Sequence, residues 1–234
     1  MKSYVIHLIR HGMTEANVKG QYVGVTDTPL CDEGKRKLYD LRENYEYPKV
    51  DLYYSSPLSR CVDTCKIIYP ESEIKIVDDL RECNFGDYEG KTTKELSKDE
   101  GFLKWLESGQ QIKPPNGESG PDFQKRVCKA FEGIVEEMMR SGTTSSAVFA
   151  HGGVIMLLLT AYSVPKSDFY DWIVDNGCGY SLRITPGLWM RSKVLEVYDK
   201  IPLGCKSEIE GDFKYLMETV KKAARKAYGT SEEV

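Results

Sequence analysis

Four polar features each follow a short apolar stretch, and together they hold the residue types that bind and transfer a phosphoryl group. They are Arg10-His11 in LIRHGMTEAN, Arg60 in SSPLSR, Glu82 in LREC, and His151 in FAHGGVI. Guanidinium groups bind the oxygens of a tetrahedral anion in pairs, an imidazole can act as a nucleophile, and a carboxylic acid can donate a proton. Each residue alone has an ordinary structural explanation, such as a core histidine. Their joint placement after successive strands favours an anion site, because ligands of open α/β sheets collect at the carboxyl ends of strands.

Other phosphoryl-transfer chemistries lack their residues here. A cysteine nucleophile needs an arginine six positions later, and Cys31, followed by Lys37, comes closest. Asp27 lies in no DxD pattern, and the sequence holds no GxxxxGK[ST] loop. Histidine remains the best candidate nucleophile. His7 and His11 would lie about 13 Å apart along a strand, so we expect them to share no metal ion and His7 to be structural.

The segments that must position these residues alternate between two patterns. Short apolar runs predict strands at 4–10, 50–56, 73–79 and 145–151, and amphipathic runs predict helices at 32–44, 57–69, 91–108, 121–141 and 153–163. This alternation is typical of βαβ units in a layered α/β sheet. GYSLRIT and RSKVLEVY, separated by PGLWM, predict an edge hairpin. Because Arg10 and His11 would alternate across a strand, we expect a bend at Gly12 to turn both toward one ligand.

Two regions depart from the alternation. Residues 91–121 combine an expected helix with the loop QQIKPPNGESGP, which predicts a lid inserted after the third strand. Residues 206–228 space apolar side chains at intervals of three and four and end in several cations, which predicts an amphipathic helix. We expect this C-terminal segment, 201–234, to pack on the core or at a dimer contact.

Composition limits the classes of function. A chain of 234 residues with 41% hydrophobic content can bury one substantial core. Its net charge of −4 gives no broad basic field for nucleic acid or an anionic membrane. No stretch approaches the roughly 20 apolar residues of a membrane span, and the N-terminal apolar run is too short for a signal peptide. Seven cysteines without CxxC spacing favour reduced thiols. We therefore expect a cytoplasmic monomer or homodimer whose partner is a small phosphorylated metabolite.

The motifs resemble the histidine phosphatase superfamily, the phosphoglycerate mutase-like clan, over most of residues 3–198. The resemblance rests on LIRHGMTEAN, GVTDTPLCDEGKRKL, YYSSPLSRCVDT, LRECNFGDYEG, PNGES with Arg126, and FAHGGVI. It implies a three-layer αβα fold with a mostly parallel central sheet flanked by helices. It also implies that residues 1–200 form the histidine phosphatase domain, with the helical lid at about 91–121.

The resemblance further implies roles for individual residues. His11 is similar to the family's transiently phosphorylated nucleophile, Glu82 to its proton donor, and Arg10, Arg60 and His151 to the walls of its phosphate pocket. The substrate-binding residues that it implies are Asn17, Gly24 and Gly152. We expect one nitrogen of His11 to donate to a backbone carbonyl, and phosphate oxygens to raise the pKa of Glu82. No metal or organic cofactor is implied.

Some positions depart from the family pattern. Val23 stands where mutases of the clan have a small hydroxyl residue, and Met13 where many relatives have Glu. VDNGCGYSLRI resembles the α-ribazole phosphatase branch. The leading hypothesis is a phosphomonoesterase acting through phosphohistidine, with α-ribazole 5′-phosphate as one candidate substrate. The alternatives are a phosphoglycerate mutase and a non-catalytic phosphate-binding or scaffold protein. A non-catalytic protein would be expected to lack His11, Glu82 or His151, and all three are present.

Overall fold

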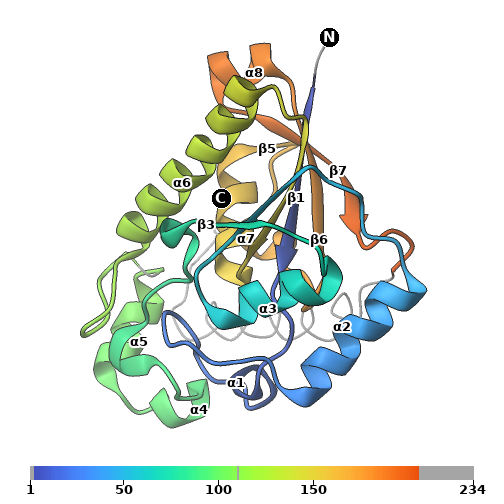
Figure 1. Ribbon diagram of the computed structural model, residues 1–234. Helices are drawn as coiled ribbons and strands as arrows, with labels where there is room; N and C mark the ends of the chain where they lie inside the picture. Colours follow the sequence, from blue (N-terminus) through green and yellow to red (C-terminus); the bar gives the residue numbers. More distant parts are fainter. Residues whose placement is uncertain (1–2, 110, 206–234) are drawn as a thin grey trace, which may run out of the picture.

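A computed structural model describes residues 3–109 and 111–205, in which one mixed sheet is covered by helices on both faces (Figure 1). The strands lie in the order β3-β2-β4-β1-β6-β7-β5. Their bounds are β1 Tyr4–Arg10, β2 Leu52–Ser55, β3 Ile74–Ile76, β4 Ser145–Ala150, β5 Ser163–Val164, β6 Gly179–Ile184 and β7 Leu195–Ile201. The predicted helix at 206–228 lies outside the described residues.

The parallel half of the sheet has β1 paired with β4, β4 with β2, and β2 with β3, all in the same direction. β6 runs antiparallel to both β1 and β7. β4 is almost entirely buried, as expected for a strand covered on both faces. The layered, mostly parallel α/β architecture predicted from the alternation is therefore confirmed.

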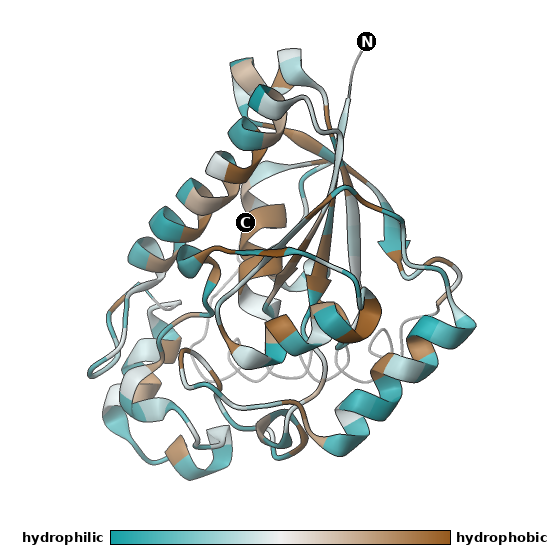
Figure 2. Cartoon of the chain, viewed as in Figure 1, coloured by the Kyte–Doolittle hydropathy of each residue, from teal (hydrophilic) through white to brown (hydrophobic). Residues whose placement is uncertain are grey.

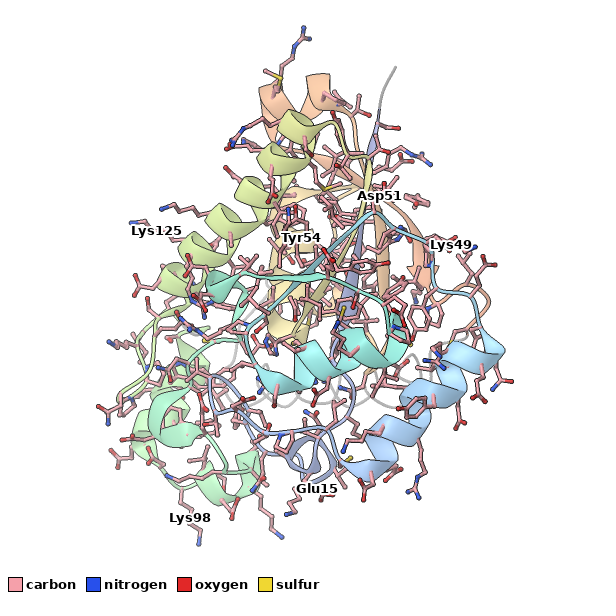
Figure 3. The ribbon with its side chains drawn as sticks, viewed as in Figure 1. Glu15, Lys49, Asp51, Tyr54, Lys98 and Lys125 are labelled. Atoms are coloured by element: carbon pink, nitrogen blue, oxygen red, sulfur yellow. The ribbon has the colours of Figure 1, made fainter. Side chains whose placement is uncertain are left out.

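The covering helices belong to two pairs. α2 (Asp32–Asn44) packs against α3 (Ser59–Ile68), and α6 (Gly120–Ser141) packs against α7 (Gly152–Tyr162). α6 turns an apolar stripe inward and a polar one outward (Figure 2). Charged side chains such as Lys98 and Lys125 point away from the body of the molecule, whereas Tyr54 lies inside it (Figure 3). Among the described helices, none has both the length and the apolar character that crossing a membrane requires.

The predicted edge hairpin is wrong in two respects. β6 and β7 do pair antiparallel, but β6 lies between β1 and β7, and the two-residue β5 forms that edge of the sheet. The segment between them is a helix, α8 (Pro186–Ser192), rather than a turn. Pro186 suits the first turn of a helix because its fixed φ is already helical. Trp189, almost fully buried, then packs against Phe131 and Tyr162.

The segment expected as one helix at 91–108 forms two. α4 (Thr93–Leu96) begins at the capping residue Thr92, and α5 (Glu100–Glu107) begins at Asp99, whose carboxylate accepts from the Phe102 N–H at 2.9 Å. This part of the chain has its own small hydrophobic cluster, made of Tyr88, Leu96, Phe102 and Trp105 with Tyr22 and Phe85 packed against it. We call it the lid cluster.

Several short strands and helices link the longer elements of the fold. The predicted strand at 73–79 is limited to β3, because Asp78–Leu80 turns into the 3₁₀ helix η1 and buries Leu80 completely. The other short helices are α1 (Glu15–Val18), η2 (Gly86–Tyr88) and η3 (Phe169–Trp172).

Candidate active site

The candidate site lies where β1 and β4 end and where α3 and α7 begin. The His11 N–H donates to the Ala150 carbonyl at 3.0 Å, which continues the pairing of β1 with β4 by one step. His11 and His151 are thereby brought together, with ring centroids 5.2 Å apart at an interplanar angle of 61°. Two imidazoles separated by most of the chain therefore share one site.

His11 is held in one tautomer. Its Nδ1 lies 2.6 Å from the carbonyl oxygen of Gly12, and because a carbonyl only accepts, Nδ1 carries the hydrogen. The Nε2 lone pair is then left for chemistry. Burial lowers the pKa of His11 well below its usual value, and the charges of Arg60 and Arg10 lower it further. The expected carbonyl partner is confirmed, and His11 is neutral at neutral pH.

The main chain around His11 is fixed from two sides. The Asn176 side chain donates to the His11 carbonyl at 2.9 Å, and the Gly12 N–H donates to the Thr64 hydroxyl at 2.8 Å. β1 ends at Arg10, and a Cβ on Gly12 would lie 2.6 Å from Leu38 Cδ1. Gly12 is thus a position where the chain leaves the strand and packs too closely for a larger residue.

Arg60 is completely buried at the start of α3. Its two terminal nitrogens donate to the carbonyls of Gly24 at 2.7 Å and Thr26 at 2.9 Å, and its Nε donates to His151 Nδ1 at 3.3 Å. His151 therefore carries its hydrogen on Nε2, which lies 2.8 Å from the Ser56 hydroxyl. Burial and the charge of Arg60 lower the pKa of His151 well below its usual value. The acceptors of these three hydrogen bonds are all neutral, while the charges of Glu82, Asp27 and Glu89 favour the cation from nearby.

Arg10 brings a second guanidinium to the site. One terminal nitrogen donates to the Val174 carbonyl at 2.7 Å, but its Nε is buried and has no hydrogen-bond partner within the described residues. A Cβ on Gly152 would lie 3.4 Å from this Nε. A buried, unsatisfied donor on a cation costs free energy. An anion beside Gly152 would satisfy it.

Glu82 lies against the first turn of α7. Its Oε1 accepts from the Cys83 N–H and its Oε2 from the Gly153 N–H, both at 2.9 Å. A Cβ on Gly153 would lie 2.5 Å from Oε1, so the close approach requires glycine. Burial raises the pKa of Glu82, while the two N–H groups, Arg60 and Arg10 oppose that rise. The raised pKa has the expected direction, and burial is its largest cause; the effect of phosphate oxygens stays a prediction.

The loop at 24–26 is shaped by a residue that sequence reasoning missed. The Glu89 carboxylate accepts from the backbone N–H groups of Val25 at 3.0 Å, Thr26 at 2.8 Å and Phe85 at 3.1 Å. A Cβ on Gly24 would lie 2.0 Å from the Cys83 carbonyl oxygen. Glu89 is seven residues from Glu82 in the same motif, LRECNFGDYEG, but only the folded chain shows that it faces this loop.

The remaining predicted residues, Asn17 and His7, make contacts of different kinds. Asn17 forms a capping box with Thr14, whose N–H donates to Asn17 Oδ1 at 3.1 Å, and its substrate-binding role stays a prediction. His7 lies outside the site, with Nδ1 2.9 Å from the Ser181 hydroxyl on the neighbouring strand, so its structural role is confirmed. Within the described part of the chain, no group of three or more His, Cys, Asp or Glu side chains could hold a metal ion.

The fold and the residues gathered at this edge of the sheet define a class of protein. The chain belongs to the histidine phosphatase superfamily, branch 1, whose family model matches residues 6–195. The adenosylcobalamin/alpha-ribazole phosphatase of Escherichia coli (strain K12) is 30% identical over 182 residues, which cover 76% of this chain and 88% of that protein. The resemblance seen in the motifs is therefore confirmed.

Two further proteins show the breadth of the family. The crystal structure of the alpha-ribazole phosphatase from Shigella flexneri matches with a TM-score of 0.70 at 26% identity, covering 83% of this chain and 94% of that one. A 2,3-bisphosphoglycerate-dependent phosphoglycerate mutase of Rhizobium etli is 32% identical over 163 residues, 64% of this chain and 76% of the mutase. The three-layer, phosphoglycerate mutase-like fold is thus confirmed. These findings support a phosphatase enzyme, with the mutase as the lesser alternative.

Proposed function

We propose that the chain is a phosphomonoesterase that hydrolyses a small organic phosphate through a phosphohistidine on His11. The observation that carries the proposal is the state of His11: Nδ1 donates to the Gly12 carbonyl, so Nε2 is an unprotonated nucleophile near the charges of Arg10 and Arg60. Phosphoryl transfer depends mainly on positioning and on charge stabilisation. Arg10 and Arg60 supply the charge, and Glu82 supplies the proton.

The first half-reaction forms the intermediate. His11 Nε2 attacks phosphorus, the bond from phosphorus to the ester oxygen breaks, and the protonated Glu82 gives its proton to that oxygen, which leaves as an alcohol. His151, neutral and anchored by Ser56 and Arg60, borders the phosphoryl group. The Arg10 Nε gains an anionic acceptor as the substrate binds. All of these groups are side chains of the protein, so the proposal includes no metal or organic cofactor.

The second half-reaction restores the enzyme. The Glu82 carboxylate takes a proton from a water molecule as its oxygen attacks the phosphohistidine. The bond from Nε2 to phosphorus breaks, inorganic phosphate leaves, and Glu82 is protonated again for the next cycle. One carboxyl group serves as acid and then as base, which requires a pKa nearer the working pH than that of an exposed glutamate. Burial shifts the pKa of Glu82 in that direction.

For the substrate we propose α-ribazole 5′-phosphate, supported by the phosphatase relatives of that name, which match most of this chain. The lid at about 91–121 would select the leaving group, and Asn17, Gly24 and Gly152 would contact substrate. We further propose a cytoplasmic protein, supported by seven cysteines in the reduced thiol form. We propose that it acts as a monomer or homodimer.

The test compares wild type with His11→Ala on α-ribazole 5′-phosphate and p-nitrophenyl phosphate. Wild type should release phosphate from both and, when quenched during turnover, carry one phosphoryl group on His11 detectable by mass spectrometry. His11→Ala should lose both the turnover and the phosphoryl group while keeping its thermal unfolding temperature. Retained turnover in His11→Ala would refute the nucleophile assignment.

The mutase remains a second candidate because the Rhizobium etli relative shares the matched region. A mutase uses the same phosphohistidine but returns the phosphoryl group to the substrate instead of to water. Incubation with 3-phosphoglycerate and a phosphorylated primer distinguishes the two functions. Isomerisation faster than phosphate release would favour the mutase.

A further inference from the structure

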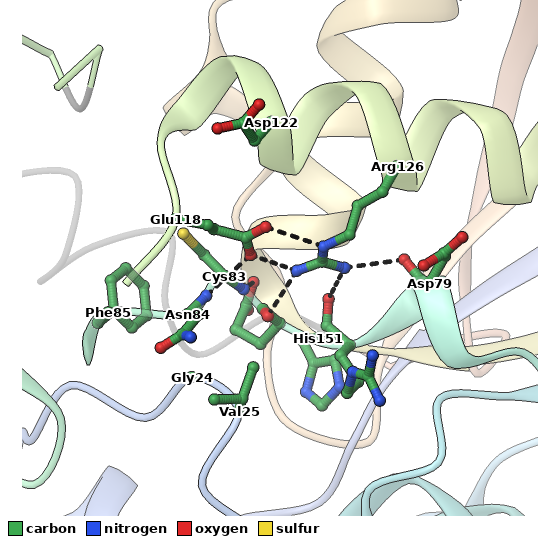
Figure 4. A network of polar contacts seen from close by, with 12 residues as sticks. Gly24, Val25, Asp79, Cys83, Asn84, Phe85, Glu118, Asp122, Arg126 and His151 are labelled. Carbon is green, nitrogen blue, oxygen red and sulfur yellow. Dashed lines mark hydrogen bonds and ion pairs between the residues drawn. The ribbon is translucent and has the colours of Figure 1, made fainter. Parts of the chain in front are cut away.

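A largely buried ion pair at the start of α6 contacts the segment that carries Glu82. Arg126 donates from Nε to Glu118 Oε2 at 3.0 Å and from a terminal nitrogen to Glu118 Oε1 (Figure 4). Both side chains are largely buried, 19% exposed for Arg126 and 18% for Glu118. We call this pair the Arg126 brace.

The remaining donors of Arg126 all go to the main chain around Glu82. They reach the carbonyls of Asp79 at 2.9 Å, Arg81 at 2.7 Å and Glu82 at 2.9 Å. A guanidinium has five N–H donors in a rigid plane, and here every one has an acceptor. Lysine could not replace it, because an ammonium has three donors and no fixed plane.

The other half of the brace holds the chain just beyond Glu82. Glu118 Oε1, besides binding Arg126, accepts from the Asn84 N–H at 2.9 Å. Glu82 is therefore clamped on both sides along the backbone, while its carboxyl oxygens are bound by the N–H groups of Cys83 and Gly153. The Arg126 brace lies at the start of the long helix α6, which is capped by Ser119 and contains Pro121 in its first turn.

We infer that the Arg126 brace positions Glu82 for proton transfer to the leaving oxygen. This inference rests on the proposed function, because it assigns the brace to the residue proposed as acid. Arg126 is 44 residues from Glu82 in sequence, and none of the six hydrogen bonds of the brace reaches His11 or Arg60. It should therefore affect protonation of the leaving group more than binding of the phosphoryl group.

Leaving-group dependence separates positioning from general stability. p-Nitrophenolate leaves readily without a proton, whereas phenolate and especially an alkoxide need one. A general acid contributes roughly 10²- to 10⁴-fold, and misplacement removes part of that factor. We expect Arg126→Lys to lower kcat/KM about 30-fold for an alkyl phosphate such as glycerol phosphate, about tenfold for phenyl phosphate and no more than about twofold for p-nitrophenyl phosphate.

The experiment measures these three substrates with wild type, Arg126→Lys and Glu118→Gln, together with the inhibition constant of inorganic phosphate. The matched control is Arg183→Lys, since Arg183 also pairs with a glutamate, Glu196, but both of these side chains are exposed. Phosphate inhibition should stay within about twofold in every variant. In a Glu82→Gln background, Arg126→Lys should cause no further loss on phenyl phosphate, because the residue that it positions can no longer donate a proton.

Equal losses on all three substrates, or an independent loss in the Glu82→Gln background, would overturn the positioning role while leaving the phosphatase proposal intact. No turnover of any phosphomonoester by wild type would instead overturn the proposed function. If Arg126→Lys fails to fold, Glu118→Gln decides the outcome alone, since it keeps the side-chain volume and removes one acceptor shared by Arg126 and Asn84.

Discussion

Gly153→Ala tests how closely the carboxyl group of Glu82 must be placed. The added Cβ would lie 2.5 Å from Glu82 Oε1, and ordinary contact begins at 3.4 Å, so the oxygen must move by about 0.9 Å. The same movement breaks the hydrogen bond from the Gly153 N–H to Oε2, now 2.9 Å long. Because a side-chain end moves easily, the fold should survive. A misplacement of about 1 Å can cost 10²-fold in rate, so we expect kcat to fall about 100-fold.

The assay is steady-state hydrolysis of phenyl phosphate, with inhibition by inorganic phosphate and thermal unfolding measured in parallel. Phosphate inhibition and the unfolding temperature should change little, because neither depends on where the acid lies. Gly133→Ala is the matched control, since Gly133 is also a helical glycine but a Cβ there meets nothing within 4 Å. A kcat for Gly153→Ala within about threefold of wild type would refute the claim that Glu82 acts from this position.

Three further predictions concern charge. Because burial raises the pKa of Glu82, kcat/KM of the wild type should fall as pH rises through that pKa. Glu82→Gln should be slow and should lack this alkaline decline. A Glu82→Gln profile with the same decline as wild type would contradict the acid role of Glu82. Glu89→Gln should weaken phosphate inhibition about tenfold by placing an N–H donor against Thr26, whereas Glu95→Gln, which alters a capping carboxylate on α4, should not. Burial lowers the pKa of His7 to about 4, so the folded state binds fewer protons than the unfolded state below pH 6.5 and loses stability as pH falls. His7→Gln should reduce that loss by about 2 to 3 kcal/mol in urea unfolding between roughly pH 7 and 4.5; an unchanged pH slope would be inconsistent with it.

The convergence of the site could be predicted because it depends on topology. Arg10 ends β1, and His11 and His151 directly follow β1 and β4. These strands pair in parallel, and such strands end at one edge of the sheet whatever their exact register. The carbonyl partner of His11 was predictable for a similar reason, since a histidine proposed as a nucleophile needs one free nitrogen and a partner for the other; which nitrogen is free comes from the structure. These inferences need residue types and order but no distances.

The parts that could not be predicted depend on contacts between distant segments. PGLWM has the composition of a turn, and it forms a helix because Trp189 finds a buried place beside Phe131 and Tyr162. α4 and α5 are separate because Asp99 caps the start of α5. The spacing of apolar residues is the same for one continuous helix, so it does not predict this break. Arg126 was recognised as part of a motif. Its distance from Glu82 in the sequence does not predict that it donates to three backbone carbonyls around that residue.

The packing of the lid cluster affects which substitutions this protein can tolerate as it evolves. Its aromatic side chains pack mainly on one another, so substitutions in α4 and α5 can reshape this segment without disturbing the strands that lead to His11 and His151. Phe85 is the exception, because it packs against both the lid cluster and the main core. Under the proposed role of the lid in selecting the leaving group, changes of substrate preference should therefore be tolerated in α4 and α5 and be constrained at Phe85, three residues from Glu82.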